Sequence, residues 1–437
     1  MKCYLMNKNT KTALIELDTE YNNITKIYEI YDKNYLPLNI FNSLSDKSKN
    51  PTKELDRWFK GRGIPSWRKD LKNLLKKLNI YSPEELLNKA YGLSLSDQYW
   101  IKDINQENLN WKDVNFFTND FEYKGFLNAS LSDSRSAENI SLHSPNNTTD
   151  GMLQKAWTIE NKKRVLVKGT FYSTNQEPIN EWIASLMCKK LGIDYCNYTT
   201  DIIDGKIVSK CEDFINENEE MIPAYDIFYS EKKKNSVSDF EHYINVLEEH
   251  GIVNARKQVS DMFLIDYLML NFDRHLKNFG VIRNVENLKW EKTTPVFDTG
   301  ESLECDKDIY QINFVDRAGK FFTNTNKSFS EIIKKIDLSY YDFSSLFGIE
   351  NEIKNKFKET QFYTNITDER ISKITNGLAS RIANVSSLQK KYILEMSKNQ
   401  ENLNKDIENE EFDDYNEEEN NNPPSLNNDE DEEEDER

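Results

Sequence analysis

The sequence predicts an α+β protein made of two folded units and an acidic tail. Short runs of alternating apolar and polar residues, typical of strands, occur in both halves, and amphipathic helical patterns dominate the C-terminal half. A chain of 437 residues is also longer than one typical domain. We expect five regions: a mixed α/β accessory domain at 1–127, a linker at 128–150, a sheet-containing lobe at 151–215, a mainly helical lobe at 216–397 and a disordered tail at 398–437.

The accessory domain carries both strand and helix signals. Strands are expected at Thr12–Leu17 and Ile24–Ile30, where apolar and β-branched residues are frequent. The leucines of Leu71–Leu78 recur at helical spacing, which is more typical of a core face than of a ligand site. Ser82-Pro83-Glu84-Glu85 has the pattern of a helix N-cap followed by a first-turn proline and acidic residues.

The second half begins with a strand, a helix and a hairpin. Lys163–Lys168 alternates apolar and polar residues, and a helix is expected to begin at Pro178 and end near Gly192. Asp204-Gly205 lies between two strand-like runs, which predicts a hairpin with a type I′ turn. A further helix is expected at Ala255–Leu270, and more helices from Ser328 to about Met396.

Most of the net charge of −18 belongs to the C-terminal tail. Residues 401–437 carry 18 acidic and 2 basic residues, so the rest of the chain is nearly neutral. The folded part therefore has no basic excess suited to direct nucleic-acid binding. The tail has little apolar content and is expected to be a disordered, solubilising segment, with docking of a basic partner as the alternative.

The five cysteines are scattered and contain no C-x-x-C pair, which argues against a disulfide framework and a structural zinc site. The N-terminal residues lack the apolar core of a signal peptide, and the most apolar stretch, Met262–Leu270, is short and contains Asp266. We therefore expect reduced thiols, no membrane association and a cytoplasmic location.

Three oxygen-bearing side chains in the second half have the spacing of a phosphoryl-transfer site. Asp273 and Asn278 are spaced as in the D-x-x-x-x-N catalytic loop of kinases, where the Asp orients the acceptor hydroxyl and the Asn binds Mg²⁺. Asp298 lies 20 positions further on, in Phe-Asp-Thr-Gly, and is the candidate second metal ligand. Oxygen ligands favour Mg²⁺ over zinc.

A lysine and a glutamate upstream could complete this site. Lys168 ends a predicted strand, and Glu181 lies in the following helix, as required for an ion pair that directs the ammonium to nucleotide phosphates. Glu177 competes for this role, but it precedes Pro178 and is expected to cap the helix N-terminus. Taken alone, each residue could equally be an ordinary turn or surface residue.

Two stretches around these residues resemble the signature of HipA-like serine/threonine kinases. They are Asn271–Asn278, with sequence NFDRHLKN, and Val296–Gly300, with sequence VFDTG. Asn180-Glu181 with Leu191-Gly192-Ile193 also resembles a helix of this family, and Thr149–Lys155 resembles its phosphate loop. The resemblance covers about 140–390 and implies a two-lobed protein-kinase-like fold that uses ATP and Mg²⁺.

The same resemblance implies further site residues. Those expected to bind nucleotide are Gly151, Lys155, Lys168, Glu212, Phe214 and His275, with the backbone of 209–214 as the adenine hinge. In the family, a phosphate-loop hydroxyl can be autophosphorylated, and the matching position is Thr149, with Thr148 beside it. A phosphate there would repel the phosphates of a nucleotide. Unlike ordinary protein kinases, the loop has one glycine, and Asp-Arg-His replaces His-Arg-Asp.

Two other functions remain open at this stage. Asp-Arg-His-x-x-Asn also occurs in phosphoinositide-type lipid kinases, although no basic or amphipathic membrane face is visible. The chain could instead be a nucleotide-binding, inactive scaffold, against which the intact Lys168, Asp273, Asn278 and Asp298 argue. The resemblance further implies a toxin-like role, a protein substrate that the sequence does not identify, and a small DNA-binding antitoxin partner.

Overall fold

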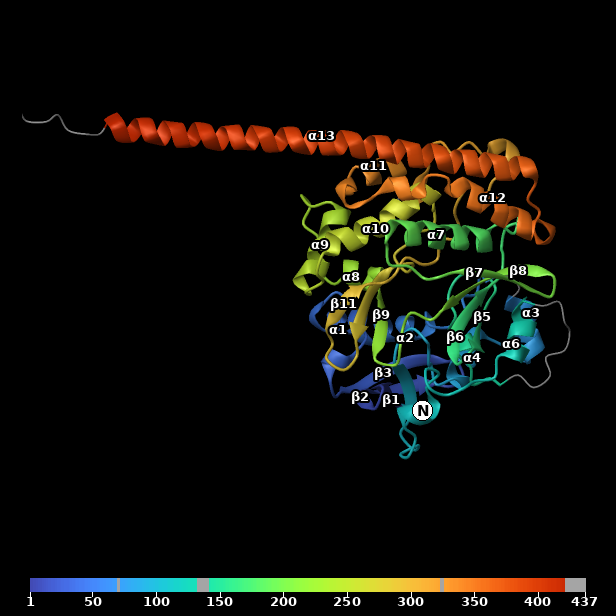
Figure 1. The fold of residues 1–437 in the computed structure, drawn as a ribbon. Helices are drawn as coiled ribbons and strands as arrows, with labels where there is room; N and C mark the ends of the chain where they lie inside the picture. Colours follow the sequence, from blue (N-terminus) through green and yellow to red (C-terminus); the bar gives the residue numbers. More distant parts are fainter. Residues whose placement is uncertain (69–70, 132–140, 323–325, 421–437) are drawn as a thin grey trace, which may run out of the picture. The chain divides into compact units, whose positions relative to one another are not determined.

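The computed structural model describes residues 1–68, 71–131, 141–322 and 326–420 (Figure 1). Met1–Ile382 form one compact unit, and the rest of the chain, from Ala383, forms a second. Every candidate site residue lies in the first unit, so the site can be described within it. The mixture of helices and sheets confirms the predicted α+β class.

The N-terminal sheet contains both strands predicted for the accessory domain. Its order is β3-β2-β1-β4, and every pair is antiparallel. The strands are β1 (Lys2–Asn7), β2 (Thr10–Asp18), β3 (Asn23–Ile30) and β4 (Tyr99–Asp103). Alternate residues of β2, including Ala13, Ile15 and Leu17, are buried against helix α2 because successive strand residues point to opposite faces.

Short helices lie between β3 and β4 and after β4 along the chain. They are α1 (Leu38–Ser45), α2 (Pro51–Lys60), α3 (Leu71–Leu78), α4 (Pro83–Lys89), α5 (Trp111–Val114) and α6 (Lys124–Leu131). Leu71 and Leu74 are buried, as the leucine spacing predicts. The Ser82 side chain accepts a hydrogen bond from the Glu85 amide at 3.3 Å, which confirms the predicted N-cap of α4.

A second four-stranded antiparallel sheet, ordered β5-β6-β8-β7, contains the predicted hairpin. Its strands are β5 (Lys155–Glu160), β6 (Lys163–Lys168), β7 (Thr199–Ile203) and β8 (Lys206–Glu212). Asp204 and Gly205 both have positive φ, at 49° and 75°, as a type I′ turn requires. Helix α7 (Glu177–Leu191) packs against β7 and β8 and ends at left-handed Gly192, as predicted.

The remainder of the first unit is mainly helical, as expected. Its helices are α8 (Ala224–Phe228), α9 (Asp239–Glu249), α10 (Ala255–Met269), α11 (Phe329–Ile333), α12 (Ile349–Thr360) and the start of α13 (Asp368–Asn420). It also holds the sheet β11-β10-β9 and the hairpin β12-β13. These strands are β9 (Glu219–Pro223), β10 (Gly280–Asn284), β11 (Trp290–Thr293), β12 (Ala318–Lys320) and β13 (Asn326–Ser328).

Polar contacts join the accessory domain to the sheet β11-β10-β9. Arg283 on β10 pairs with Glu220 on β9 and donates to the Tyr99 hydroxyl of β4 at 3.3 Å. Lys8 reaches Glu286 at 2.5 Å. Burial raises the pKa of Tyr99 well above its usual value, so its hydroxyl stays protonated. The accessory domain is therefore held to the part of the chain that carries the candidate site.

Two segments differ from or lie beyond the predicted boundaries. Helix α13 continues to Asn420, past the predicted start of the tail at 398, because its Glu, Lys and Leu residues favour helix without needing an apolar face. Residues 421–437 lie outside the described residues, so the disorder of that part stays a prediction. The predicted linker contains the end of α6 and a 3₁₀ turn at Pro145–Thr148, and residues 132–140 lie outside the description.

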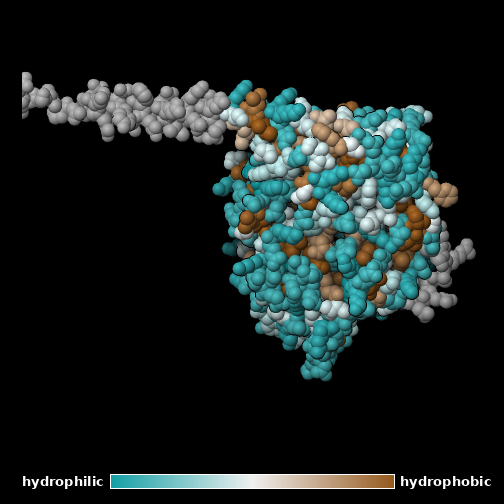
Figure 2. All heavy atoms as spheres, in the orientation of Figure 1, coloured by the Kyte–Doolittle hydropathy of each residue, from teal (hydrophilic) through white to brown (hydrophobic). Residues whose placement is uncertain are grey.

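The thiols and the surface agree with the composition. All five cysteines are free and buried, as expected for reduced thiols. No helix among the described residues is long and apolar enough to cross a membrane. The face in Figure 2 is largely hydrophilic, with apolar side chains in small separate groups.

Gly280, at the start of β10, tests the strand pairing next to the catalytic loop. A Cβ atom there would lie 2.0 Å from the Ile222 carbonyl oxygen on β9. We expect Gly280→Ala to lower the free energy of unfolding by about 1–3 kcal/mol or more, because the strands must separate. Thermal or urea unfolding measures this change. The control is Gly251→Asn. A Cβ atom at Gly251 has no neighbour within 4 Å, and asparagine tolerates the positive φ of that position. An equal loss of stability in both variants would contradict the account.

Candidate active site

Lys168 lies between two carboxylates at the centre of the site. Its ammonium group, at the end of β6, contacts Glu181 of α7 and donates to Asp298 Oδ1 at 2.6 Å. Lys168 and Glu181 are almost fully buried. Glu181 also accepts a hydrogen bond from the Ser209 hydroxyl of β8. The predicted Lys168–Glu181 ion pair is therefore present, and the strand, the helix and the Asp298 loop meet at one ammonium group.

The charges in this cluster stabilise one another. Burial opposes the charged form of Lys168, but Asp298 and Glu181 outweigh it and raise the pKa of the lysine above its usual value. Burial would also raise the pKa of Asp298, but the ammonium groups of Lys168 and Lys155 hold it well below its usual range. Burial raises the pKa of Glu181 despite its pairing with Lys168. Asp298 is thus an anion at neutral pH, the form that can bind a metal.

Glu177 does not compete for Lys168 in the described contacts. Its carboxylate accepts hydrogen bonds from the backbone amides of Phe171 and Tyr172, both at 2.7 Å. These bonds cap the loop before α7, whereas the sequence predicted that Glu177 would cap the N-terminus of the helix.

Arg274 joins the catalytic loop to the segment that carries Asp298. Its guanidinium is fully buried and forms a two-bond pair with Asp266 of α10, at 2.8 and 2.9 Å. The remaining nitrogen, Nη1, donates to the carbonyl oxygens of Asn278 and Phe297, at 2.5 and 2.7 Å. A single side chain thus fixes the end of the D-x-x-x-x-N loop against the residue before Asp298.

The two ends of the catalytic loop also contact each other. The side-chain nitrogen of Asn278, Nδ2, donates to the backbone carbonyl of Asp273 at 3.0 Å. The side-chain oxygen of Asn278 is therefore left as the group that can ligate a metal. His275 Nε2 lies 3.7 Å from Asp273 Oδ2, and burial lowers the pKa of His275. His275 is therefore mainly neutral at pH 7. The Asp273 carboxylate itself is partly exposed and accepts from Lys320 at 2.5 Å.

Asn180, beside Glu181, holds the other side of the Asp298 segment. Its amide nitrogen donates to the carbonyl oxygens of Gly300 and Ser302, at 2.7 and 2.8 Å. Asp298 itself has a left-handed backbone, with φ of 54°, which is strained for a residue other than glycine. The Asn-Glu pair of α7 therefore positions both the lysine and the strained aspartate.

The candidate phosphate loop is held by an arginine from the accessory domain. Arg68 donates to the Thr149 hydroxyl at 2.6 Å, to the Thr149 carbonyl and to the Gly151 carbonyl at 3.0 Å. Gly151 has φ of 95°, and a Cβ atom there would lie 2.7 Å from Lys155 Nζ. Lys155 therefore lies directly against the single glycine, and burial lowers its pKa. Thr149 is buried, whereas Thr148 is partly exposed and donates to the Pro145 carbonyl.

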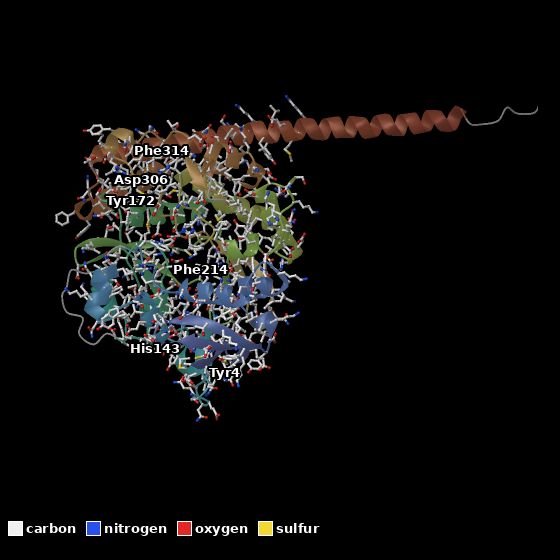
Figure 3. All side chains as sticks on the ribbon, turned by 180° about the vertical axis from the view of Figure 1, so that it is seen from behind. Tyr4, His143, Tyr172, Phe214, Asp306 and Phe314 are labelled. Carbon is white, nitrogen blue, oxygen red and sulfur yellow. The ribbon has the colours of Figure 1, made fainter. Side chains whose placement is uncertain are left out.

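The predicted hinge follows β8. The Glu212 side chain is exposed and pairs with Lys163 at 2.8 Å, so its carboxylate is not directed at the candidate site. The Asp213 amide donates to the Arg164 carbonyl at 2.9 Å, which directs the backbone of Glu212 and Phe214 away from β6. The Phe214 ring lies 5.3 Å from the Phe297 ring, next to Asp298. In Figure 3, Phe214 lies below Tyr172 and Asp306.

The oxygen groups present fit Mg²⁺. Among the described residues, no three His, Cys, Asp or Glu side chains form a metal cage. Mg²⁺ commonly takes one or two protein oxygens and completes its shell with phosphates and water. An ionised Asp298 and the Asn278 amide oxygen, joined through Arg274, match that requirement.

An open cavity of about 1020 Å³ lies beside the phosphate loop. Its lining includes Lys53, Arg57 and Lys60 of α2 as well as Asp150 and Lys277. Lys277 and Asp150 pair at 3.0 Å and so bridge the catalytic and phosphate loops. The cavity is large enough for a peptide segment or a small molecule.

The structure thus brings together Lys168, Glu181 and Asp298 through direct contacts, and Asp273 and Asn278 through their loop. Sequence reasoning missed Asn180 as an anchor of the Asp298 segment, and it missed the whole Arg274–Asp266 clamp. Arg274 lies within the quoted motif, so a buried arginine between two motif residues was the available signal. Arg68 and Lys320 gave no local signal, because their partners are far away in sequence.

The order of these residues along the chain, and the contacts between them, define a protein with a kinase-like site. Residues 147–383 match the model of the HipA-like C-terminal domain. That match spans more than half of the chain, so the protein belongs to the HipA-like kinase family.

The individual relatives have low sequence identity to this chain. Serine/threonine-protein kinase CtkA of Helicobacter pylori (strain J99 / ATCC 700824) is 24% identical over 174 residues, which cover 38% of this chain and 53% of that protein. The chain therefore matches about half the length of this curated relative. A crystal structure of the Helicobacter pylori proinflammatory kinase CtkA gives a TM-score of 0.44 at 17% identity, covering 56% of this chain and 95% of that one. HipA of Shewanella oneidensis MR-1, solved with HipB and operator DNA, gives 0.49 at 14% identity, with coverages of 89% and 99%.

Arg274→Met tests whether the clamp supports the site. The variant leaves the buried Asp266 with a hydrogen bond from the Asn271 side-chain amide but without a cationic partner, so we expect the free energy of unfolding to fall by about 3–5 kcal/mol. The double variant Asp266→Leu/Arg274→Met removes both charges and should recover much of that loss. Urea unfolding of Arg274→Met, Asp266→Leu and the double variant measures the coupling between the two residues. Additive losses would contradict the proposed clamp.

Proposed function

We propose that this protein is an ATP- and Mg²⁺-dependent serine/threonine protein kinase. The observation that carries the proposal is the convergence of Glu181 and Asp298 on Lys168, with Arg274 fixing the catalytic loop against the same segment. Membership of the HipA-like kinase family supports it. The site contains a cation for nucleotide phosphates, two oxygen ligands for a metal and a carboxylate for the acceptor hydroxyl.

In this mechanism the chain acts mainly by positioning. Lys168, held by Glu181, contacts the α- and β-phosphates of ATP, and Lys155 and the backbone at Gly151 approach the phosphates from the other side. The hinge backbone at Glu212 and Phe214 binds adenine. Asp273 accepts a hydrogen bond from the Ser or Thr hydroxyl and orients it toward the γ-phosphate. His275, mainly neutral, lies beside Asp273 and can hydrogen-bond a phosphate oxygen.

Mg²⁺, when bound by Asn278 and Asp298, would neutralise charge on the β- and γ-phosphates. The Lys168–Asp298 contact is compatible with this arrangement, because Lys168 would keep its ion pair with Glu181 if Asp298 ligated a metal.

Two competing functions remain as outcomes to test. A nucleotide-binding scaffold would not need a buried, fully paired Lys168, whose burial is costly unless the charge is used. A phosphoinositide-type kinase would need a basic or amphipathic membrane face, and the sequence of the folded part, which is nearly neutral, gives no sign of one. A protein hydroxyl is therefore the preferred acceptor.

The toxin-like role and the small DNA-binding antitoxin partner stay proposals that rest on the family. The cytoplasmic location stays a proposal as well. The nearly neutral folded part still argues against direct nucleic-acid binding by this chain.

The catalytic assignment is tested with radiolabelled ATP and Mg²⁺ on the full chain. Asp273→Asn, Asp298→Asn and Lys168→Met should each lower phosphate incorporation by about 100-fold or more, because each removes an interaction with the reacting groups. The control is Asp201→Asn on β7, whose carboxylate is exposed and pairs with Lys210. A scaffold would incorporate no label in any variant, including the unmodified chain.

Autophosphorylation at Thr149 is tested by mass spectrometry after incubation with ATP. The Thr149 hydroxyl is buried on Arg68, so the loop must leave its position before transfer. We expect Arg68→Met to speed labelling and Thr149→Asp to abolish ATP binding through charge repulsion. Label on Thr148 alone, unchanged in Thr149→Ala, would reassign the phosphosite.

A further inference from the structure

Lys320 contacts the candidate catalytic aspartate from a hairpin that sequence reasoning did not connect with the site. Its ammonium nitrogen lies 2.5 Å from Asp273 Oδ1. The two residues are 47 positions apart. About half of the Lys320 side chain is exposed, so the ammonium reaches the aspartate from the open side of the site.

Neighbouring contacts hold the hairpin at the catalytic loop. Arg317, three residues before Lys320, pairs with Asp306 through two bonds of 2.8 Å. The same guanidinium lies 3.8 Å from the centre of the Phe272 ring, next to Asp273. Gly319 lies against the Phe321 and Phe329 rings, where a Cβ atom would be within 3.3 Å of both. The position of Lys320 is therefore built by its neighbours and is not a chance surface contact.

The other cations of the site have different partners. Lys168 contacts Glu181 and Asp298, and Lys277 contacts Asp150. Arg274 uses its donors on Asp266 and on two carbonyl oxygens. Among the lysines and arginines of the described residues, only Lys320 donates a hydrogen bond to the Asp273 carboxylate.

We propose that Lys320 is a further catalytic residue that bridges Asp273 and the phosphoryl group in transit. This inference rests on the proposed kinase function. An ammonium group has three donors, so one can hold Asp273 Oδ1 while another contacts a γ-phosphate oxygen. Asp273 Oδ2, on the side of His275, then accepts a hydrogen bond from the hydroxyl that receives the phosphoryl group.

The transfer step balances without any proton from Lys320. The hydroxyl oxygen forms a bond to the γ-phosphorus, and the bond from that phosphorus to the β,γ-bridging oxygen breaks. The electron pair of the broken bond stays on ADP, and the hydroxyl proton passes through Asp273 to solvent. Lys320 keeps its charge and offsets the negative charge of the transferring oxygens, which is the kind of fixed donor that lowers such barriers most.

The opposite role would be inhibitory. Lys320 would then occupy Asp273, as a plug, and would have to leave before an acceptor binds. The two roles predict opposite changes in rate. A catalytic lysine slows transfer when removed, whereas a plug speeds it.

The test is single-turnover transfer from radiolabelled ATP by the full chain, measuring both phosphoprotein and ADP at saturating ATP and Mg²⁺. Lys320→Met should lower the rate by about 100-fold with the Kd for ATP changed by less than about twofold. Lys320→Arg, which keeps a cation, should recover part of the rate. Lys334→Met, an exposed lysine at the end of α11, is the matched control and should retain the rate.

A double variant shows whether Lys320 acts through Asp273. If it does, Lys320→Met should cost little more in an Asp273→Asn background, because the two act as a unit. A rate within about twofold of the unmodified chain, a faster rate, or an equal loss of ATP binding would each overturn the proposal. If the unmodified chain transfers no phosphate while binding ATP, the kinase function fails and the role of Lys320 fails with it. If the unmodified chain is active and Lys320→Met keeps that activity, the catalytic role of Lys320 is rejected and the kinase function stands.

Discussion

The buried pair of Arg274 and Asp266 is the interaction on which the rest of the site depends. A guanidinium with no exposed surface is costly to bury unless it is paired and hydrogen-bonded, and here it makes four hydrogen bonds, to one carboxylate and two carbonyl oxygens. Those carbonyls belong to Asn278 and Phe297, so the pair sets the spacing between the catalytic loop and the Asp298 segment. Helix α10 supplies the carboxylate and is itself buried in the helical part. The two candidate metal ligands are therefore positioned by the core.

A second constraint comes from the charges around Lys168. The lysine is buried only because Glu181 and Asp298 compensate it, and Asp298 remains ionised only because lysines surround it. Asn180 and the strained backbone of Asp298 keep that carboxylate aimed at the lysine. The accessory domain contributes as well, since Arg68 holds the phosphate loop through Thr149 and Gly151. The site is thus assembled from several separate parts of the chain around a few shared polar groups.

Much of the local structure could be predicted from the sequence, because hairpins, caps and helix ends depend on neighbouring residues. Asp204-Gly205, Ser82-Pro83 and Gly192 each gave the expected turn, cap or helix end. The Lys168–Glu181 pair was predictable because a strand and the next helix bring the two together. Arg68 and Lys320 were not predictable, since their partners Thr149 and Asp273 are 81 and 47 residues away.

The central claim is that Asn278 and Asp298 bind one metal–nucleotide complex. Crystals grown with Mn²⁺ and a non-hydrolysable ATP analogue test this most directly, because the anomalous signal of manganese locates the ion. The account predicts a peak at about 2.1–2.3 Å from a side-chain oxygen of each residue and in contact with the analogue's phosphates. A nucleotide bound elsewhere, or manganese that contacts neither side chain, would contradict it.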